Sequence, residues 1–171
     1  MKKFALLLLF LAFAGSTVYA QFTQSELVAE WKRAKVYTKE YLDAMPADGY
    51  GFKPTPEIRS YAQQMLHLAD ANYFFAATAS GKKGPAASQE KGVAPNKEAV
   101  TKAVMESYDF AIEALESLKP SQLNEKVKLE GQELTRFQAF GKAFEHQTHH
   151  RGQCTIYLRL HKVTPPQEKL F

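Results

Sequence analysis

The chain has 171 residues, of which 45% are apolar and 23% are charged. This length and composition predict one globular domain with a sizeable core, and they exclude a disordered chain, a collagen and a multi-span membrane protein. A single cysteine excludes an internal disulfide framework and a cysteine-rich zinc module. The formal net charge of +4 is too small to predict a nucleic-acid-binding protein, and no basic run adds to it beyond the first residues.

Residues 1–20 show the three-part pattern of a secretory signal peptide. Two lysines follow the initiating methionine, residues 4–14 form an apolar run, and residues 18–20 place small side chains where a signal peptidase reads them. The apolar run is short for a membrane span, which needs roughly 20 residues. The sequence therefore predicts a cleaved chain that begins at Gln21, is exported to the periplasm or the extracellular space, and keeps no stable membrane anchor. An uncleaved anchor is the alternative.

Four later stretches show helical periodicity, with apolar residues recurring at three- and four-residue steps. They span about residues 23–45, 56–79, 96–118 and 133–160. Helices of this length with polar exteriors favour a bundle, whose core commonly builds a metal or cofactor site from facing helices. The predicted fold class is therefore all-α, a four-helix bundle that occupies residues 21–171 as one domain.

The segments between the predicted helices differ in character. Residues 80–95 are rich in Gly, Pro, Ser and Lys, which predicts a long exposed loop. Val127 and Leu129 alternate with charged residues before Gly131, which favours a short extended segment. Cys154 is interpreted as a buried thiol, with a reactive or dimerising thiol as the alternative. Four aromatic residues are interpreted as core, with the lining of a pocket as the alternative: Trp31, Tyr41, Phe74 and Phe75.

The placement of the histidines along the chain favours a metal-binding site. Three of the five histidines fall within residues 146–150. On a helix, His146 and His150 lie about one turn apart, with Cβ atoms on the order of 6 Å from each other, so both imidazoles can reach one metal ion. His149 points about 100° away from His150 and is expected outside the pair.

His67 occupies a comparable border of the apolar arc on the second predicted helix. One nitrogen from His67 and two from the later pair would leave a fourth position open for water or substrate, as in catalytic zinc sites. Nitrogen-only ligation suits Zn, Ni, Fe or Cu and disfavours Mg or Ca. The alternative is that no metal binds, because exposed helices carry such pairs harmlessly and a single border histidine is often a hydrogen-bonded core residue.

Further polar residues surround the paired histidines in sequence. Gln153 and Tyr157 share their helix face by spacing and are predicted to face a substrate, with polar filling of the bundle end as the alternative. Arg151 is expected to pack or to pair with a carboxylate. Glu145 is expected on the solvated surface, since its direction does not suit a general base. The spacing assigns no catalytic residue.

Two stretches resemble the DinB-like family of four-helix proteins. The first runs from residue 50 to 60 and on to 67–69, and the second from 146 to 153 and on to 157–159. The resemblance covers nearly the whole chain after residue 20, and the second stretch is the more specific. It implies a divalent metal, zinc or nickel first and iron next, at an open bundle end. The ligands that it implies are His67, His146 and His150. It also implies a homodimer.

Three functional hypotheses follow. The first is an exported metal-dependent transferase or hydrolase that acts on a small molecule, because some relatives in the resembled family are thiol-dependent transferases or isomerases. Export would separate this chain from the cytoplasmic thiols that those relatives use. The second is a non-catalytic metal- or ligand-binding bundle, and the third is a structural or stress-associated bundle without metal. The histidine pattern favours the first two.

Overall fold

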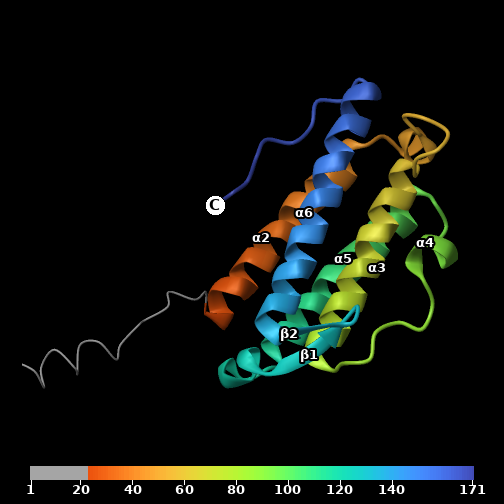
Figure 1. Cartoon of the computed structure of the whole chain (residues 1–171). Coiled ribbons are helices and arrows are strands. Elements are labelled where there is room, and N and C mark those ends of the chain that lie inside the picture. Colours follow the sequence, from red (N-terminus) through yellow and green to blue (C-terminus); the bar gives the residue numbers. More distant parts are fainter. Residues whose placement is uncertain (1–22) are drawn as a thin grey trace, which may run out of the picture.

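The computed structural model describes residues 23–171, so the predicted signal peptide lies outside the described residues. Four long helices, α2 (Gln24–Ala44), α3 (Tyr61–Ser80), α5 (Lys97–Glu116) and α6 (Arg136–Leu160), run alongside one another (Figure 1). Helix α3 packs against α5 and α6, and α2 packs against the same two helices. The prediction of a mainly helical bundle is therefore confirmed.

Polar caps set where these helices begin. Thr23, Ser60 and Thr135 each accept a hydrogen bond from the backbone N–H three residues later. The Glu or Gln at that later position accepts a bond from the backbone of the cap in return, which completes a capping box. Asn96 caps α5 through its side chain alone. These local bonds satisfy N–H groups that the helices themselves leave unpaired.

Helix α3 begins at Tyr61, later than the start predicted near residue 56. Ser60 is the cap and has extended backbone angles of φ −69° and ψ 166°. Pro54 and Pro56 lie before it in turns, and each disfavours helical geometry in the residue that precedes it. The prolines and the capping box together delay the helix.

A short helix interrupts the predicted loop after α3. Helix α4 (Gln89–Gly92) lies beside α3, and most of the side chains around it are exposed. Two 3-10 helices complete the connections, η1 (Ala47–Gly51) after α2 and η2 (Pro120–Asn124) after α5. Helix α4 thus orders part of the loop against α3.

The predicted extended segment is one strand of a hairpin. Strands β1 (Lys126–Leu129) and β2 (Gln132–Thr135) are antiparallel, with Lys126 opposite Thr135 and Leu129 opposite Gln132. Gly131 in the turn has a φ of +80°, a conformation that glycine adopts without steric cost. Leu129 is buried, and β1 packs against α3 and α6. The hairpin therefore covers one end of the α3–α6 contact.

The core lies between the four long helices. Trp31 and Tyr41 are buried there, as predicted, and Cys154 is fully buried. Phe74 contradicts its assignment to the core, because its side chain is 48% exposed. The buried face of α3 follows a helical step through Leu68, Ala69, Asn72 and Ala76. That step turns position 74 outward.

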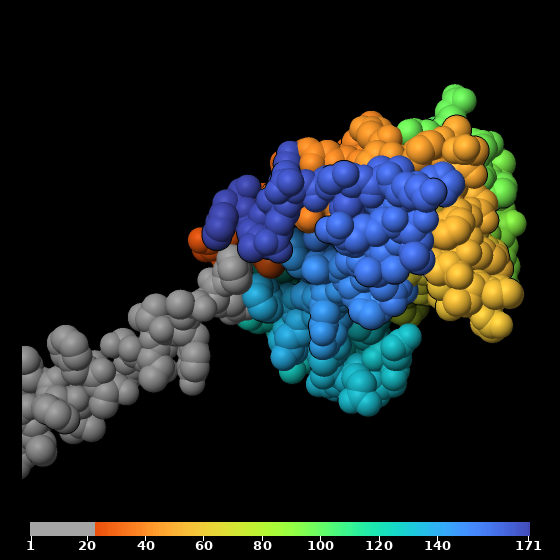
Figure 2. Space-filling model, turned by 90° about the horizontal axis from the view of Figure 1, so that it is seen from above, coloured from red at the N-terminus to blue at the C-terminus, as the bar shows by residue number. Residues whose placement is uncertain are grey.

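The C-terminal segment lies against α2. Lys169 of this segment pairs with Glu40, and the backbone carbonyl of Lys169 accepts a hydrogen bond from Arg33. The segment is seen in dark blue beside α2 in Figure 2. Among residues 23–171, no helix is both long and apolar enough to cross a bilayer.

Candidate metal centre

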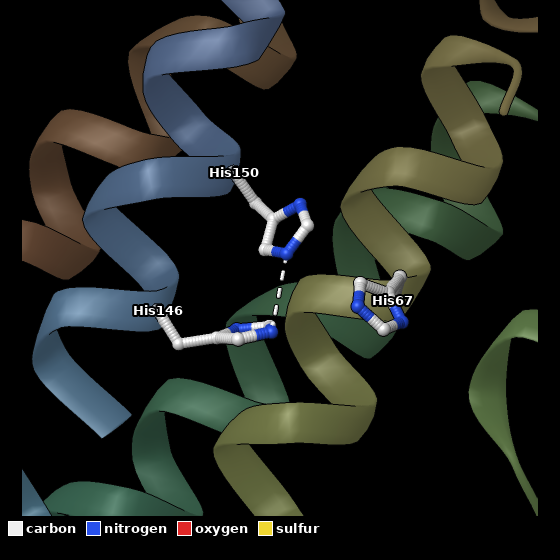
Figure 3. A group of neighbouring side chains, drawn as sticks. All are labelled: His67, His146 and His150. Atoms are coloured by element: carbon white, nitrogen blue, oxygen red, sulfur yellow. Dashed lines mark hydrogen bonds between the residues drawn. The ribbon is translucent and has the colours of Figure 1, made fainter. Parts of the chain in front are cut away.

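Three histidines from two helices meet between α3 and α6 (Figure 3). His67 comes from α3, and His146 and His150 come from successive turns of α6. One nitrogen of each lies within 4.8 Å of the others. The Nε2 atoms of His146 and His150 are 3.1 Å apart, near the roughly 3.3 Å expected for two nitrogens on one tetrahedral zinc ion. This donor set fits a divalent ion.

The position of this histidine cluster differs from the predicted bundle end. His67 lies in the second turn of α3, and the paired histidines lie in the middle of α6. Figure 3 shows turns of α6 on both sides of the pair. The cluster therefore lies partway along the contact between α3 and α6, because the second turn of α3 packs opposite the middle of α6.

All three imidazoles favour the neutral state. Burial, reinforced by the neighbouring rings, lowers the pKa of His146 to about 4 and that of His150 to about 3. Burial and the nearby Arg59 guanidinium lower the pKa of His67. A metal needs the unprotonated nitrogen of each ring. The cluster is thus in the protonation state that binds metal at neutral pH.

A side-chain amide supports His150 from outside the cluster. The amide of Gln64 lies 2.7 Å from His150 Nδ1 and also contacts Gln153. Gln153 in turn lies 3.0 Å from the Nε2 of His149. His149 is exposed and stays outside the cluster, as predicted. No role was predicted for Gln64 from the sequence, although its position one turn before His67 was the available signal.

The other two histidines have different surroundings. His67 Nδ1 lies 3.4 Å from Arg59 Nη2 and 3.5 Å from Glu90 Oε2. His146 packs against the Phe75 ring, with ring centres 5.8 Å apart. Its Nδ1 is buried and has no hydrogen-bond partner among residues 23–171. His146 is therefore held mainly by packing.

Gln153 and Tyr157 lie on the side of the cluster where a polar cavity opens. Both line a cavity of about 610 Å³, together with Arg59, Gln64 and Glu90. The hydroxyl of Tyr157 donates a 2.8 Å hydrogen bond to the backbone carbonyl of Arg59, so it fixes the segment before α3. Substrate contact by Gln153 and Tyr157 stays a prediction.

A second cavity lies under the hairpin. Its volume is about 490 Å³, and His146 and His149 form part of its wall. The apolar part of the wall consists of Phe75, Leu129 and Leu134. The histidine cluster thus lines this cavity through His146, whereas the polar cavity is lined by Gln64, Arg59 and Glu90, which contact His150 and His67.

A buried polar network sets the rotation of α6. The Tyr108 hydroxyl lies 2.7 Å from Thr38 Oγ1 and donates to Gln147 Oε1 at 2.8 Å. Arg151 donates to the same oxygen at 2.7 Å and stacks over Tyr37. Because Gln147 follows His146 directly, the network orients the histidine pair. No role was predicted for Gln147 from the sequence.

The two charged residues next to the pair behave as expected. Arg151 is 6% exposed and packs in this network. None of the ion pairs formed within the described part of the chain involves it. Glu145 is exposed and pairs with Lys142 at 2.9 Å. Neither residue reaches into the histidine cluster.

Comparisons with known proteins agree with the resemblance of the two histidine stretches. The model of the DinB superfamily matches residues 30–154. The uncharacterized protein YjoA of Bacillus subtilis strain 168 is 22% identical over 139 residues, which cover 79% of this chain and 88% of that protein.

Two solved structures show the same fold. A DinB-like protein from Bacillus cereus ATCC 10987 has a TM-score of 0.76 at 18% identity, covering 86% of this chain and 98% of that one. YjoA from Bacillus subtilis has a TM-score of 0.64 at 19% identity, covering 85% and 96%. Since the family model spans well over half of the sequence, this chain belongs to the DinB superfamily.

Proposed function

We propose that this protein binds one divalent metal ion through His67, His146 and His150 and uses it in a transferase or hydrolase reaction on a small molecule. The observation that carries this proposal is the convergence of three neutral imidazoles within the reach of one ion. Nitrogen ligands suit zinc or nickel, and also iron. A bound ion would act as a Lewis acid that lowers the pKa of a water or thiol ligand.

The two cavities support a small-molecule substrate. Their volumes of about 490 and 610 Å³ fall in the usual range for small-molecule sites, roughly 300–1,000 Å³. The smaller offers an apolar wall through Phe75 and Leu134, and the larger offers Arg59 and Gln153. An apolar group and a polar group of one substrate, or two co-substrates, would each find a matching surface, the first beside His146 and the second beside the residues that contact His67 and His150.

A non-catalytic metal- or ligand-binding bundle, associated with stress, is the second candidate. Among residues 23–171, no carboxylate joins the histidine cluster. The nearby Glu145 pairs with Lys142, and Glu90 pairs with Arg59. Neither Glu145 nor Glu90 is thus free to serve as a general base, which favours binding without turnover.

Metal content tests the proposal directly. The protein is purified without chelators or a histidine tag and measured by mass spectrometry beside a His146→Ala/His150→Ala variant, with His149→Ala as the matched control. We expect about one ion per chain in the wild type and the control and none in the double variant. Absence of metal from the wild type, even after incubation with Zn²⁺ or Ni²⁺, would overturn the proposal.

Turnover separates the two candidates. The metal-loaded protein is incubated with panels of small thiols paired with electrophiles and of small hydrolysable esters and amides, beside the double histidine variant. Metal-dependent product formation that the double variant lacks would identify an enzyme. Stoichiometric metal with no turnover across the panels would favour the binding bundle.

Export and assembly complete the proposal. Residues 1–20 support cleavage and release to the periplasm or outside the cell, and the family resemblance supports a homodimer. Cell fractionation with N-terminal sequencing should find the mature protein outside the cytoplasm, beginning at Gln21. Analytical ultracentrifugation should give twice the chain mass. Recovery of the full-length chain from the cytoplasm would refute export. A measured mass equal to that of one chain would refute the homodimer.

A further inference from the structure

The segment between α3 and α5 is anchored beside the histidine cluster. Asp70, one turn after His67 on α3, accepts hydrogen bonds from the backbone N–H groups of Gln89 and Glu90, at 2.6 and 3.1 Å. Its carboxylate also accepts from the Ser88 hydroxyl at 2.6 Å. Figure 1 shows α4 lying alongside α3. The carboxylate of Asp70 therefore fixes the start of α4 close to His67.

This anchoring places the Glu90 carboxylate between a cation and an imidazole. Its Oε1 accepts a 3.0 Å hydrogen bond from Arg59 Nε, and its Oε2 lies 3.5 Å from His67 Nδ1. The side chain of Glu90 is 23% exposed. Both an acceptor, Glu90, and a donor, Arg59, thus reach the same ring nitrogen of His67.

Metal binding would decide which partner His67 uses. One ring nitrogen of His67 faces His146 and His150, and the other faces away from them (Figure 3). Since Nδ1 contacts Arg59 and Glu90, Nε2 is left for an ion. A neutral ring that gives its Nε2 lone pair to a metal carries its proton on Nδ1. That proton needs an acceptor, and a guanidinium has none.

We propose that Glu90 accepts the Nδ1–H of His67 and is a positioning residue for the metal centre, a role that rests on the proposed metal binding. The carboxylate holds the ring with Nε2 toward the cluster. It also offsets the positive charge of Arg59 beside a cation site. Through Glu90, occupation of the metal site holds residues 81–96 against the bundle. Loss of such an outer partner typically weakens metal binding by roughly 10- to 100-fold.

The first test measures zinc affinity by competition with a chromophoric chelator, using the full chain. We expect Glu90→Ala to weaken binding by about 10- to 100-fold, and Glu90→Gln by less, because its amide oxygen still accepts a hydrogen bond. Glu57→Gln is the matched control, since this exposed carboxylate lines the same cavity as Glu90. The chelated Glu90→Gln protein should melt as the chelated wild type does.

Two readouts separate positioning from a merely structural role. The visible spectrum of the Co²⁺-loaded protein should shift in Glu90→Gln and not in Glu57→Gln. Hydrogen exchange in residues 81–96 should slow on zinc binding in the wild type and not in Glu90→Ala. Wild-type affinity and spectrum in both Glu90 variants would overturn the positioning role alone, whereas a wild type that binds no metal overturns the proposed function itself.

Replacement of Arg59 distinguishes the hydrogen bond from charge compensation. In an Arg59→Met background, Glu90→Ala should still weaken zinc binding, because the acceptor for the Nδ1–H of His67 is lost whether or not Arg59 is present. If Glu90→Ala has no effect in that background, Glu90 acts only by neutralising Arg59, and the proposed contact with His67 is refuted.

Discussion

The Tyr108 hydroxyl donates a 2.8 Å hydrogen bond to Gln147, the residue that follows His146. This bond joins α5 to α6 in the core, where both side chains are fully buried. Burial raises the pKa of Tyr108 to about 12, so the hydroxyl remains a donor at neutral pH. The side of α6 that carries His146 and His150 is therefore oriented by a bond on the core side of this helix.

Replacement of Tyr108 by Phe should destabilise the fold. The change leaves Thr38 without its 2.7 Å partner and removes one donor to Gln147, and an unsatisfied buried polar group costs about 1–3 kcal/mol. Urea unfolding checks the loss of free energy. Tyr73→Phe is the control, since its hydroxyl bonds to no other side chain in residues 23–171 and it lies partly exposed on α3. Equal stability of the two variants would contradict the role of the network.

Added metal should raise the melting temperature. An ion that binds only the folded state adds about 2.7 kcal/mol at 100 times its dissociation constant, which corresponds to roughly 5–10 °C for a domain of this size. Differential scanning fluorimetry with increasing Zn²⁺ checks this shift. His146→Ala should abolish the shift, while His149→Ala should keep it. A shift retained without His146 would place the ion elsewhere.

Cys154 should not react in the folded protein. Its side chain is fully buried, and burial raises the pKa of the thiol well above its usual range. The reactive thiolate is therefore scarce at neutral pH. Titration with a disulfide reagent should detect no thiol in the native protein and one after denaturation. Rapid reaction of the native protein would show that α6 opens or that the thiol is exposed.

Two glycines of η1 should respond differently to alanine. A Cβ at Gly49 would lie 2.3 Å from the Met45 sulfur and 3.1 Å from His161 Nε2, whereas a Cβ at Gly51 meets nothing within 4 Å. Because Met45 is fully buried, we expect Gly49→Ala to cost about 1–3 kcal/mol through overpacking. Gly51→Ala should leave stability nearly unchanged. Thermal unfolding of both variants decides the comparison.

The sequence by itself determined the features that depend on near neighbours. Helical periodicity and the caps at Thr23 and Asn96 act within a few residues, so the long helices and most of their bounds were predictable. The pairing of His146 with His150 follows from one helical turn. His67 was identified by its border position and by resemblance, and the structure brings it to the pair.

Only the tertiary structure decided what surrounds the histidines. Gln64, Arg59 and Glu90 reach the rings from α3, from the turn before it and from α4, and no local spacing links these positions to α6. The outward direction of Phe74 likewise depends on which face of α3 meets the other helices. Such contacts arise when loops close and helices pack, so they depend on the arrangement of the whole chain, whereas caps and periodicity depend on local geometry.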